Sequence, residues 1–519
     1  MARFFNTAGP CNRTDHFMIE ASSRLNDVEQ LIDMKQFFVI HAARQSGKTT
    51  YLKDLTQRLN EGGKYHALYC SLESLQKFED AKEGIPEIVK LMRKLFLFSN
   101  IPNRQEFAEN ADYTYISGVL NMSLSLFCMN IDKPLVLLFD EADCLSEDTL
   151  VTFLRQLREG YNSRSSIPFV HSLALVGMRN IRDYKAKVRP DSQSLGSASP
   201  FNIVTESMTL KNFTKEEIAS LYRQHTDETG QIFEQEAIDL VDEQTQGQPW
   251  LVNAIAREVI VKMLQSDYSK PVTASLVDEA IQTIILRRDT HIDSLLERLK
   301  EERVRTVIEP MISGEDFFGR LSDDYQYVTD LGIIKSIRGK IQPANPIYGE
   351  VIARTLSHDA QEKIELKKPD ATLPFYLKEG KIDMDALMLD FQQFWRENSA
   401  IWIEKFQYKE AAPHLILMAF LQRIINGGGY IIRDMGAGTG RTDLCLVYET
   451  QKYPVELKLR RGDKSIAEGI EQTLRYMDSF GCSEGWLAVF DRRPKISWDK
   501  KMYIKKETTD GKTVTIVGL

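Results

Sequence analysis

The sequence QFFVIHAARQSGKTT, residues 36–50, decides the fold of the N-terminal part of the chain. Its first six residues form a short apolar run typical of a buried strand. The next eight, AARQSGKT, match the pattern G-x-x-x-x-G-K-T/S except at Ala42, which stands where glycine is usual. In this pattern, backbone N–H groups at a helix N-terminus surround phosphates, a lysine binds the β- and γ-phosphates, and a hydroxyl binds Mg²⁺. We therefore expect a nucleotide site in which Lys48 and Thr49 have the last two roles.

A second apolar strand, predicted at residues 134–140, supplies the acidic half of the same site. It ends in Asp140 and Glu141, and we expect Asp140 to hold Mg²⁺ through water while Glu141 polarises the attacking water. ATP and Mg²⁺ are thus the predicted cofactors, with Thr49 and Asp140 at the metal. The residues expected to contact the nucleotide or its metal are Arg44, Gln45, Ser46, Gly47, Lys48, Thr49, Thr50 and Asp140.

Length and composition limit the class of protein. A chain of 519 residues is long enough for three or four domains, and its 43% hydrophobic and 27% charged residues are ordinary for a globular protein. The net charge of -8 argues against a protein that coats nucleic acid unspecifically. The six cysteines form no C-x-x-C pair, which argues against disulfides and zinc. Because no long apolar run or leader-like start is visible, we expect a cytoplasmic protein without membrane contact.

The pattern along the chain predicts an α/β multidomain protein. Apolar runs at 36–41, 65–71, 134–140 and 172–178 alternate with amphipathic stretches, as in a parallel sheet covered by helices. A capping box at Thr214 and Glu217 then opens a helical lid. Two short runs around Arg338-Gly339, after further helices, suggest the hairpin of a winged helix. The predicted domains are an ATPase core at 1–205, the lid at 206–290, the winged helix at 291–360, a polar linker at 361–375 and a last domain at 376–519.

The last domain contains a second group of candidate catalytic residues. Asp443 opens one apolar strand, and Glu456 and Lys458 share one face of the next, opposite its apolar core face. Two carboxylates can bind Mg²⁺, and a lysine can orient the attacking water and offset charge on a phosphodiester transition state. The alternative is an ordinary ion pair on an exposed sheet face. We expect Asp443 and Glu456 to bind the metal and Lys458 to be catalytic.

The first 360 residues resemble a STAND or Orc-type AAA-like ATPase. The resemblance is carried by AGP with His16, ARQSGKTT, FDEAD, the strand before Gly177-Met178-Arg179-Asn180, and GQPW of the lid. It implies that a polar residue after the fourth strand senses the γ-phosphate; this residue would be Arg179 or Asn180, and Asn180 is our candidate. It also implies a homo-oligomer in which an arginine reaches a neighbouring subunit, and the candidates are Arg155, Arg158 and Arg164. The alternative is that these arginines lie on a solvated helix face.

Residues 376–519 resemble the PD-(D/E)XK nuclease superfamily, with its restriction-endonuclease-like α/β fold. The resemblance rests on the order helix, two or three strands, helix, strand around G-R-x-D and E-x-K. It implies further catalytic roles for Glu410 on the first helix and Gln472 on the later one, while His414 is either a site residue or a packed one. The sequence therefore predicts an ATP-controlled nuclease that cuts DNA, or less readily RNA. The alternative is a STAND-type switch or DNA-loading ATPase whose nuclease-like domain binds without cutting.

Overall fold

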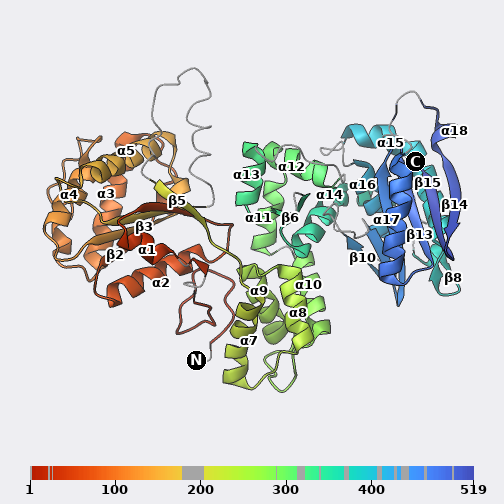
Figure 1. The fold of residues 1–519 in the computed structure, drawn as a ribbon, viewed down its shortest axis with the longest axis horizontal. Helices are drawn as coiled ribbons and strands as arrows, with labels where there is room; N and C mark the ends of the chain where they lie inside the picture. The colour runs from red at the N-terminus through yellow and green to blue at the C-terminus, as the bar shows by residue number, and fades with distance from the viewer. Residues whose placement is uncertain are drawn as a thin grey trace. The chain divides into compact units, whose positions relative to one another are not determined.

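The fold was obtained as a computed structural model in which the chain divides into two compact units (Figure 1). One unit comprises Met1–Ile284 with Thr329–Gly332, and the other comprises Ile285–Val328 with Ile333–Leu519. The structure describes residues 3–20, 24–25, 27–177, 204–287, 289–312, 322–337, 340–367, 373–405, 412–425, 429–433, 444–460, 464–491, 493 and 496–519.

The first unit is built on a five-stranded parallel sheet in the order β2-β3-β4-β1-β5. Its strands are β1 (Phe37–His41), β2 (His66–Ser71), β3 (Leu135–Asp140), β4 (Ser172–Gly177) and β5 (Val204–Thr209). The first four confirm the predicted strands, and β1, β3 and β4 are buried along their whole length, as central parallel strands should be. The fifth was not predicted, because the edge sequence VTESMT lacks a continuous apolar run.

Helices cover both faces of this sheet, as the alternating pattern predicts (Figure 1). Phe37 and Val39 of β1 belong to a core with α3, α4 and α5, whereas Phe38 and Ile40 belong to a second core with α1 and α2. Successive strand residues thus point to opposite helical layers. The helices are α1 (Val28–Asp33), α2 (Lys48–Glu61), α3 (Ala81–Phe98), α4 (Val119–Met129) and α5 (Glu147–Ser163).

The predicted helical lid follows β5. The capping box is present, since the Thr214 Oγ1 accepts from the Glu217 N–H at 3.3 Å and the Glu217 carboxylate accepts from the Thr214 N–H at 2.9 Å. Gly230, with a φ of 77°, ends this helix, and Pro249 occupies the start of α9. The lid helices are α7 (Lys215–Thr229), α8 (Gln235–Thr245), α9 (Pro249–Arg257), the π-helical turn η6 (Glu258–Met263) and α10 (Ala274–Arg287).

The second unit begins with helices and one hairpin. The elements are α11 (Thr290–Arg298), α12 (Glu302–Ile312), α13 (Asp323–Asp330), β6 (Ile334–Ile337), β7 (Lys340–Pro343) and α14 (Pro346–Lys367). Antiparallel pairing of β6 with β7 confirms the predicted hairpin, while its turn, Arg338-Gly339, lies outside the described residues. The identity of this part as a winged helix stays a prediction. Helix α14 continues through the first residues of the predicted linker, because a polar sequence does not by itself end a helix.

A six-stranded mixed sheet forms the C-terminal part, in the order β10-β11-β12-β13-β15-β14. The β12–β13 and β13–β15 pairs are parallel and the others antiparallel. The elements are η7 (Leu373–Tyr376), β8 (Leu377–Lys378), β9 (Lys381–Ile382), α15 (Met384–Lys405), α16 (Ala412–Ile425), β10 (Gly429–Arg433), β11 (Leu444–Tyr448), β12 (Gln451–Leu459), α17 (Lys464–Phe480), β13 (Glu484–Phe490), α18 (Trp498–Lys501), β14 (Tyr503–Thr509) and β15 (Lys512–Gly518). The observed run from α16 to β13 has the predicted order of helices and strands.

Two helical layers cover this sheet as well. Met477 of α17 packs with Leu487 and Val489 of β13 on one face. Aromatic rings of α15, α16 and β13 meet on the other, where the ring centroids of Phe391 and Phe420 are 5.2 Å apart. Throughout the part of the chain that the structure describes, no helix combines the length and the apolar composition needed to span a membrane.

Candidate functional site

The predicted phosphate loop connects β1 to α2. Gly47 has a φ of 91° and forms the N-terminal cap of α2, and Gln45 also has a positive φ, 57°. The Lys48 ammonium is buried and donates to the carbonyls of Ala42 at 2.9 Å and Ala43 at 3.1 Å. The lysine is therefore folded over the loop, where it can transfer its bonds from carbonyls to phosphate oxygens.

The hydroxyl of Thr49 and the carboxylate of Asp140 meet at the carboxyl end of β3. The Thr49 Oγ1 donates to Asp140 Oδ2 at 2.7 Å, although the two residues are 91 positions apart. The Tyr69 hydroxyl donates to the same oxygen at 3.0 Å, and the Glu141 N–H donates to Asp140 Oδ1 at 3.0 Å. A hydroxyl beside a well-oriented carboxylate is the oxygen-rich donor set that Mg²⁺ prefers. These residues therefore fit the metal of a bound nucleotide.

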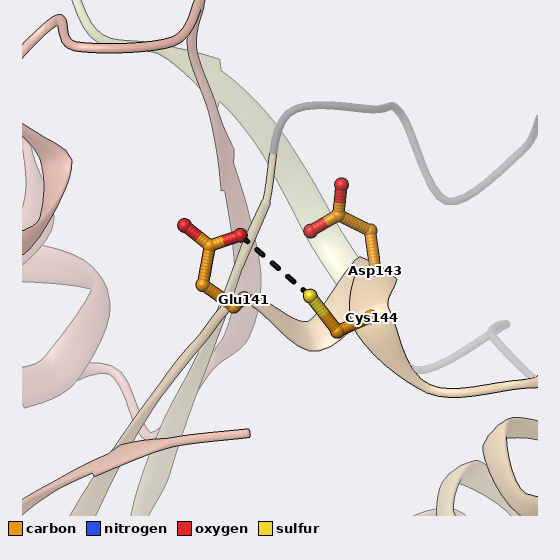
Figure 2. A group of neighbouring side chains, drawn as sticks. All are labelled: Glu141, Asp143 and Cys144. Atoms are coloured by element: carbon orange, nitrogen blue, oxygen red, sulfur yellow. Dashed lines mark hydrogen bonds between the residues drawn. The ribbon is translucent and has the colours of Figure 1, made fainter. Parts of the chain in front are cut away.

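The acids after β3 gather in one group, which Figure 2 shows with Cys144. Glu141 has a φ of 55°, and its Oε2 lies 3.9 Å from the Cys144 Sγ. A carboxylate oxygen of each of Glu141 and Asp143 and the Cys144 sulfur lie within 4.8 Å of one another. Carboxylates suit Mg²⁺ but a thiol does not, so this group belongs to the nucleotide site and does not define a second metal centre.

Charges across the site alter two protonation equilibria. Burial lowers the pKa of Lys48, while the charges of Glu141 and Asp140 oppose that shift. Burial raises the pKa of Glu141, with Lys48 acting against the shift and Asp140 and Asp143 adding to it. A carboxylate with a raised pKa is a better proton acceptor for water than an ordinary glutamate, which suits the predicted role of Glu141.

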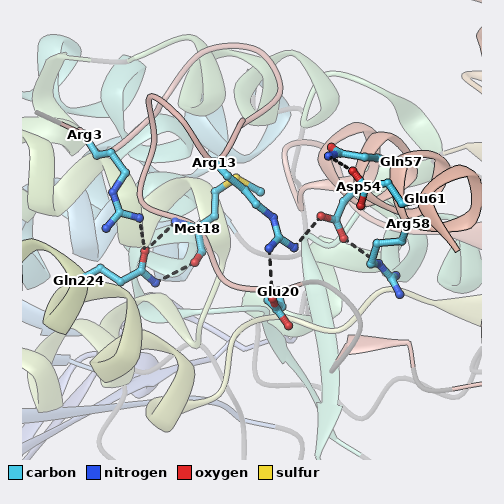
Figure 3. A network of polar contacts seen from close by, with 9 residues as sticks. All are labelled: Arg3, Arg13, Met18, Glu20, Asp54, Gln57, Arg58, Glu61 and Gln224. Atoms are coloured by element: carbon cyan, nitrogen blue, oxygen red, sulfur yellow. Dashed lines mark hydrogen bonds and ion pairs between the residues drawn. The ribbon is translucent and has the colours of Figure 1, made fainter. Parts of the chain in front are cut away.

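The N-terminal segment links the helix of the phosphate loop to the lid, as Figure 3 shows in part. On the α2 side, the Cys11 N–H donates to the Thr50 hydroxyl at 3.0 Å, and the Arg13 guanidinium donates to Asp54 at 2.9 Å. On the lid side, the Gln224 side chain bonds the Met18 carbonyl at 2.8 Å and the Met18 N–H at 3.3 Å. Thr50 is therefore held by the N-terminal segment.

The remaining predicted residues of the first unit occupy different positions. Arg44 is exposed at the loop, and Asn180 lies outside the described residues. Arg155 is exposed on α5, whereas Arg164 donates to the Lys35 carbonyl at 2.7 Å, with its guanidinium 3.9 Å from the centre of the Tyr161 ring. The contacts of Arg164 already fix its side chain within this subunit, so Arg155 is the better candidate for an intersubunit arginine.

The second candidate site lies on β12, in the middle of the C-terminal sheet. Lys458 Nζ is 2.8 Å from Glu456 Oε1, and Glu456 is only 1% exposed. Glu456 and Lys458 are in register with Leu487 and Val489 of β13, which pack against α17. The predicted shared face of the acid and the lysine is therefore correct. Because α17 covers this face and Glu456 is buried, the alternative of an ordinary ion pair on an exposed sheet face is wrong.

Gln472 lies on α17, the helix that covers this face of β12. The backbone of α17 approaches closely, since a Cβ added at Gly469 would lie 3.1 Å from the Lys458 Cγ. The Gln472 Oε1 is buried and has no hydrogen-bond partner among the described residues. An unpaired buried amide oxygen is costly in an apolar core but useful beside a ligand. Gln472 and Glu456 therefore fit a site that holds a metal or a polar substrate.

His414 of α16 is a buried titratable group whose pKa is influenced by the charge of Lys458. It is 5% exposed, and its Nδ1 has no hydrogen-bond partner in the described part of the chain. Burial, assisted by the charge of Lys458, lowers the pKa of His414 to about 3, so the ring is neutral at ordinary pH. Asp443 and Glu410 lie outside the described residues. Of the predicted set, the structure brings Glu456 and Lys458 together, and Gln472 lies on the helix that covers their face.

Sequence patterns did not indicate several residues of the nucleotide site. Tyr69 and Cys144 contact Asp140 and Glu141, but neither stands within the part of a motif that carries chemistry. Arg24 donates to the Ser46 carbonyl of the phosphate loop at 2.8 Å from 22 positions upstream. Of these residues, only Gln248 belongs to a motif that the sequence analysis named, GQPW, and it donates to the Gln45 carbonyl at 3.4 Å.

Residues 7–351 match the family model of the AAA-like domain. This match spans well over half of the chain, and the chain belongs to that family of P-loop ATPases. With the loop and acid geometry above, the first unit is an ATP-binding AAA-like ATPase module. No curated protein matches the chain.

Solved structures resemble the same part of the chain at low identity. The Walker-type ATPase PABY2304 of Pyrococcus abyssi is 14% identical, with a TM-score of 0.45, over 67% of this chain and 99% of that one. Cdc6p of Pyrobaculum aerophilum is 14% identical, with a TM-score of 0.37, over 68% and 97%. The RuvB Holliday junction branch migration motor of Thermotoga maritima is 12% identical, with a TM-score of 0.32, over 64% and 92%.

Proposed function

We propose that the chain is an ATP-controlled, Mg²⁺-dependent nuclease. The first unit binds and hydrolyses ATP, and the C-terminal domain cleaves phosphodiester bonds in DNA. The observation that carries the nuclease proposal is the pair Glu456 and Lys458, joined at 2.8 Å on β12, with the carboxylate buried and the lysine partly exposed. Desolvating a carboxylate is costly, so a buried glutamate placed here for stability alone would be a poor solution.

The chemistry of the C-terminal residues supports hydrolysis. When bound, Mg²⁺ would supply Lewis-acid activation of a phosphodiester at this centre. Glu456 offers the hard oxygen ligand, and the buried Gln472 Oε1 offers a second acceptor for a ligated water or a substrate hydroxyl. Lys458 keeps a positive charge beside the carboxylate, where it can orient water and offset charge on the phosphate. We assign Asp443 as the second metal ligand and Glu410 as an accessory acid on the predicted order of motifs alone.

The ATPase residues divide the work in the manner of P-loop enzymes. Lys48 binds the β- and γ-phosphates, Thr49 and Asp140 hold the metal, and Glu141 accepts a proton from the attacking water. Asn180 is the candidate sensor of the γ-phosphate. ATP binding then sets the conformation or assembly of the chain, and we expect the ATP-bound form of Glu141→Gln to be a larger homo-oligomer in light scattering.

DNA is the proposed substrate and partner of the second unit. The hairpin β6–β7 carries Lys335 and Lys340, with Arg338 at its predicted turn, and such a basic hairpin can contact phosphates. The chain as a whole is acidic, so contact with DNA would be local. The rival proposal is that the nuclease-like domain binds DNA without cutting it, and the same experiment decides between them.

The test compares wild-type protein with Glu456→Gln on plasmid and linear DNA, with and without ATP and Mg²⁺. Glu456→Gln keeps the side-chain shape but removes the metal-binding charge, and we expect a loss of cleavage on the order of 10²-fold or more with ATP hydrolysis retained. Glu471→Gln is the matched control, because Glu471 is an exposed residue of α17 next to Gln472.

Cleavage by Glu456→Gln at the wild-type rate would refute the assignment of this centre. If wild-type protein never cuts, yet Glu456→Gln alters DNA affinity while Glu471→Gln does not, the domain is a binding module and the rival proposal replaces the nuclease.

A further inference from the structure

The carbonyl groups of the phosphate loop are bonded by a side chain of the loop itself and by side chains from distant parts of the chain. The Lys48 ammonium binds the carbonyls of Ala42 and Ala43. The next anchors come from more distant parts of the chain: Gln248 Nε2 donates to the Gln45 carbonyl at 3.4 Å, and Arg24 Nη2 donates to the Ser46 carbonyl at 2.8 Å. In a trans peptide the C=O points opposite to the N–H of the following residue. Bonds that hold these carbonyls outward therefore turn the N–H groups of Ser46 and Gly47 inward, toward the phosphate position.

The guanidinium of Arg24 also contacts Lys211 and Phe213, which precede the first lid helix, α7, and which we call the lid entrance. It is 6% exposed, and Nε donates to the Lys211 carbonyl at 2.7 Å. The same group lies 5.0 Å from the centre of the Phe213 ring. Burial lowers the pKa of Arg24 to about 10, so it remains a cation at neutral pH, held largely by carbonyl oxygens. One buried cation thus joins Ser46 of the loop to Lys211 of the lid entrance.

Gln248 is attached to the same part of the lid. Its Oε1 accepts from the Leu251 N–H at 2.7 Å and so caps helix α9, while its Nε2 reaches the phosphate loop. The preceding residue, Gly247, accepts at its carbonyl from the Phe213 N–H at 2.9 Å. Arg24, Phe213, Gly247 and Gln248 therefore form a continuous set of contacts that begins and ends on the phosphate loop.

We propose that Arg24 and Gln248 are positioning residues that orient the phosphate-binding N–H groups and couple ATP binding to docking of the lid. Neither side chain is placed to touch the phosphates; both act through the backbone of Gln45 and Ser46. Because coupling is reciprocal, lid contacts that favour the inward N–H arrangement raise ATP affinity, and bound ATP tightens the lid by the same factor.

The lid has a second attachment that does not involve the phosphate loop. Gln224 of α7 binds both backbone groups of Met18, and Arg3 pairs with Glu228 at 2.5 Å (Figure 3 shows the Gln224 contacts). Removal of Arg24 therefore leaves the lid tethered through the N-terminal segment. Arg93 of α3, which donates to the Ala108 carbonyl at 2.7 Å, provides a matched control arginine, because this contact involves neither the phosphate loop nor the lid.

The experiment uses the full chain with Arg24→Gln, Arg24→Lys, Gln248→Ser and the control Arg93→Gln. Serine caps a helix well but is too short to reach the Gln45 carbonyl, so Gln248→Ser removes only the loop contact. Affinity for ATP with Mg²⁺ is measured by calorimetry, and protection of α7 and α9 is measured by hydrogen exchange with and without ATP.

We expect Arg24→Gln to weaken ATP binding about tenfold or more and to reduce the ATP-induced protection of α7 and α9. This corresponds to about 1.4 kcal/mol or more of coupling. Arg24→Lys should recover part of both effects, since an ammonium still donates to the Ser46 carbonyl. Gln248→Ser should weaken binding severalfold, and Arg93→Gln should leave both readouts unchanged.

A merely structural role gives a different result. If Arg24→Gln and Gln248→Ser lower the melting temperature but bind ATP within twofold of wild type and keep the lid response, the proposal is wrong. If Arg24→Gln does not fold, Gln248→Ser decides, because it removes a single long hydrogen bond and keeps the helix cap.

Discussion

Replacing Lys458 with methionine tests whether the C-terminal centre is a true buried charge pair. Methionine keeps most of the apolar stem of the lysine and removes the charge. Glu456 would remain 1% exposed with its 2.8 Å partner lost. Breaking a buried ion pair by removing one partner costs about 3–5 kcal/mol. The Lys458 side chain is 26% exposed, so we expect the lower end of that range, about 3 kcal/mol.

Tryptophan fluorescence in urea measures this cost in the full chain. The chain has five tryptophans, and only Trp250 lies in the lid. The other four lie in the C-terminal domain: Trp395, Trp402, Trp486 and Trp498. With a slope of about 2–3 kcal/mol per M urea, a loss of about 3 kcal/mol lowers the midpoint by about 1–1.5 M. ATP hydrolysis in the absence of urea should stay at the wild-type rate, because the two centres lie in different units.

The double variant Glu456→Gln/Lys458→Met separates loss of the pair from a general defect. Removing both charges leaves no uncompensated carboxylate, so the midpoint should return most of the way to that of the wild type. Mg²⁺ should raise the midpoint of Lys458→Met but not that of the double variant, since only the single variant keeps the Glu456 carboxylate that can bind the cation. An unchanged midpoint in Lys458→Met would refute the buried-pair reasoning, and a double variant as unstable as the single one would point to lost packing.

Three further perturbations probe the first unit. Asp143→Asn should shift the acid limb of the pH profile of kcat for ATP hydrolysis to lower pH. The reason is that the charge of Asp143 helps to raise the pKa of Glu141, whose ionised form is lost as pH falls. An acid limb that stays in place would exclude Glu141 as the titrating base. Thr214→Ala removes the N-terminal cap of α7 and should cost about 1 kcal/mol in thermal or urea unfolding, and a variant as stable as wild type would show that the capping box contributes little. Gly247→Ala should weaken lid protection in hydrogen exchange, because Gly247 has a φ of 70° and an added Cβ would lie 1.9 Å from the Phe213 carbonyl oxygen; unchanged protection would mean that this loop adjusts freely.

Local sequence signals were sufficient for much of the first unit. Residues 36–50 place a strand, a loop and a helix next to one another in the chain, so the phosphate loop follows from spacing alone. The same holds for the capping box at Thr214, which involves residues three positions apart. The two apolar faces of β1 likewise follow from a period of two.

Other features depended on contacts between distant residues. The edge strand β5 takes its place by pairing with β1, although its own sequence does not alternate strongly. Arg24 reaches Ser46 and Lys211, which are 22 and 187 positions away, and no local pattern records such a contact. The sequence showed only that an arginine was present.

The pair Glu456 and Lys458 shows most clearly which features follow from the sequence and which depend on the tertiary structure. The period of two alone determined that Glu456 and Lys458 share a face of their strand. Whether that face meets water or a helix depends on where the chain returns after β12, and the crossover through α17 to the parallel strand β13 lays a helix over it. Tertiary structure thus decided that the acid is buried and that α17, with Gln472, covers its face, because burial depends on which elements pack together and not on the residues along one strand.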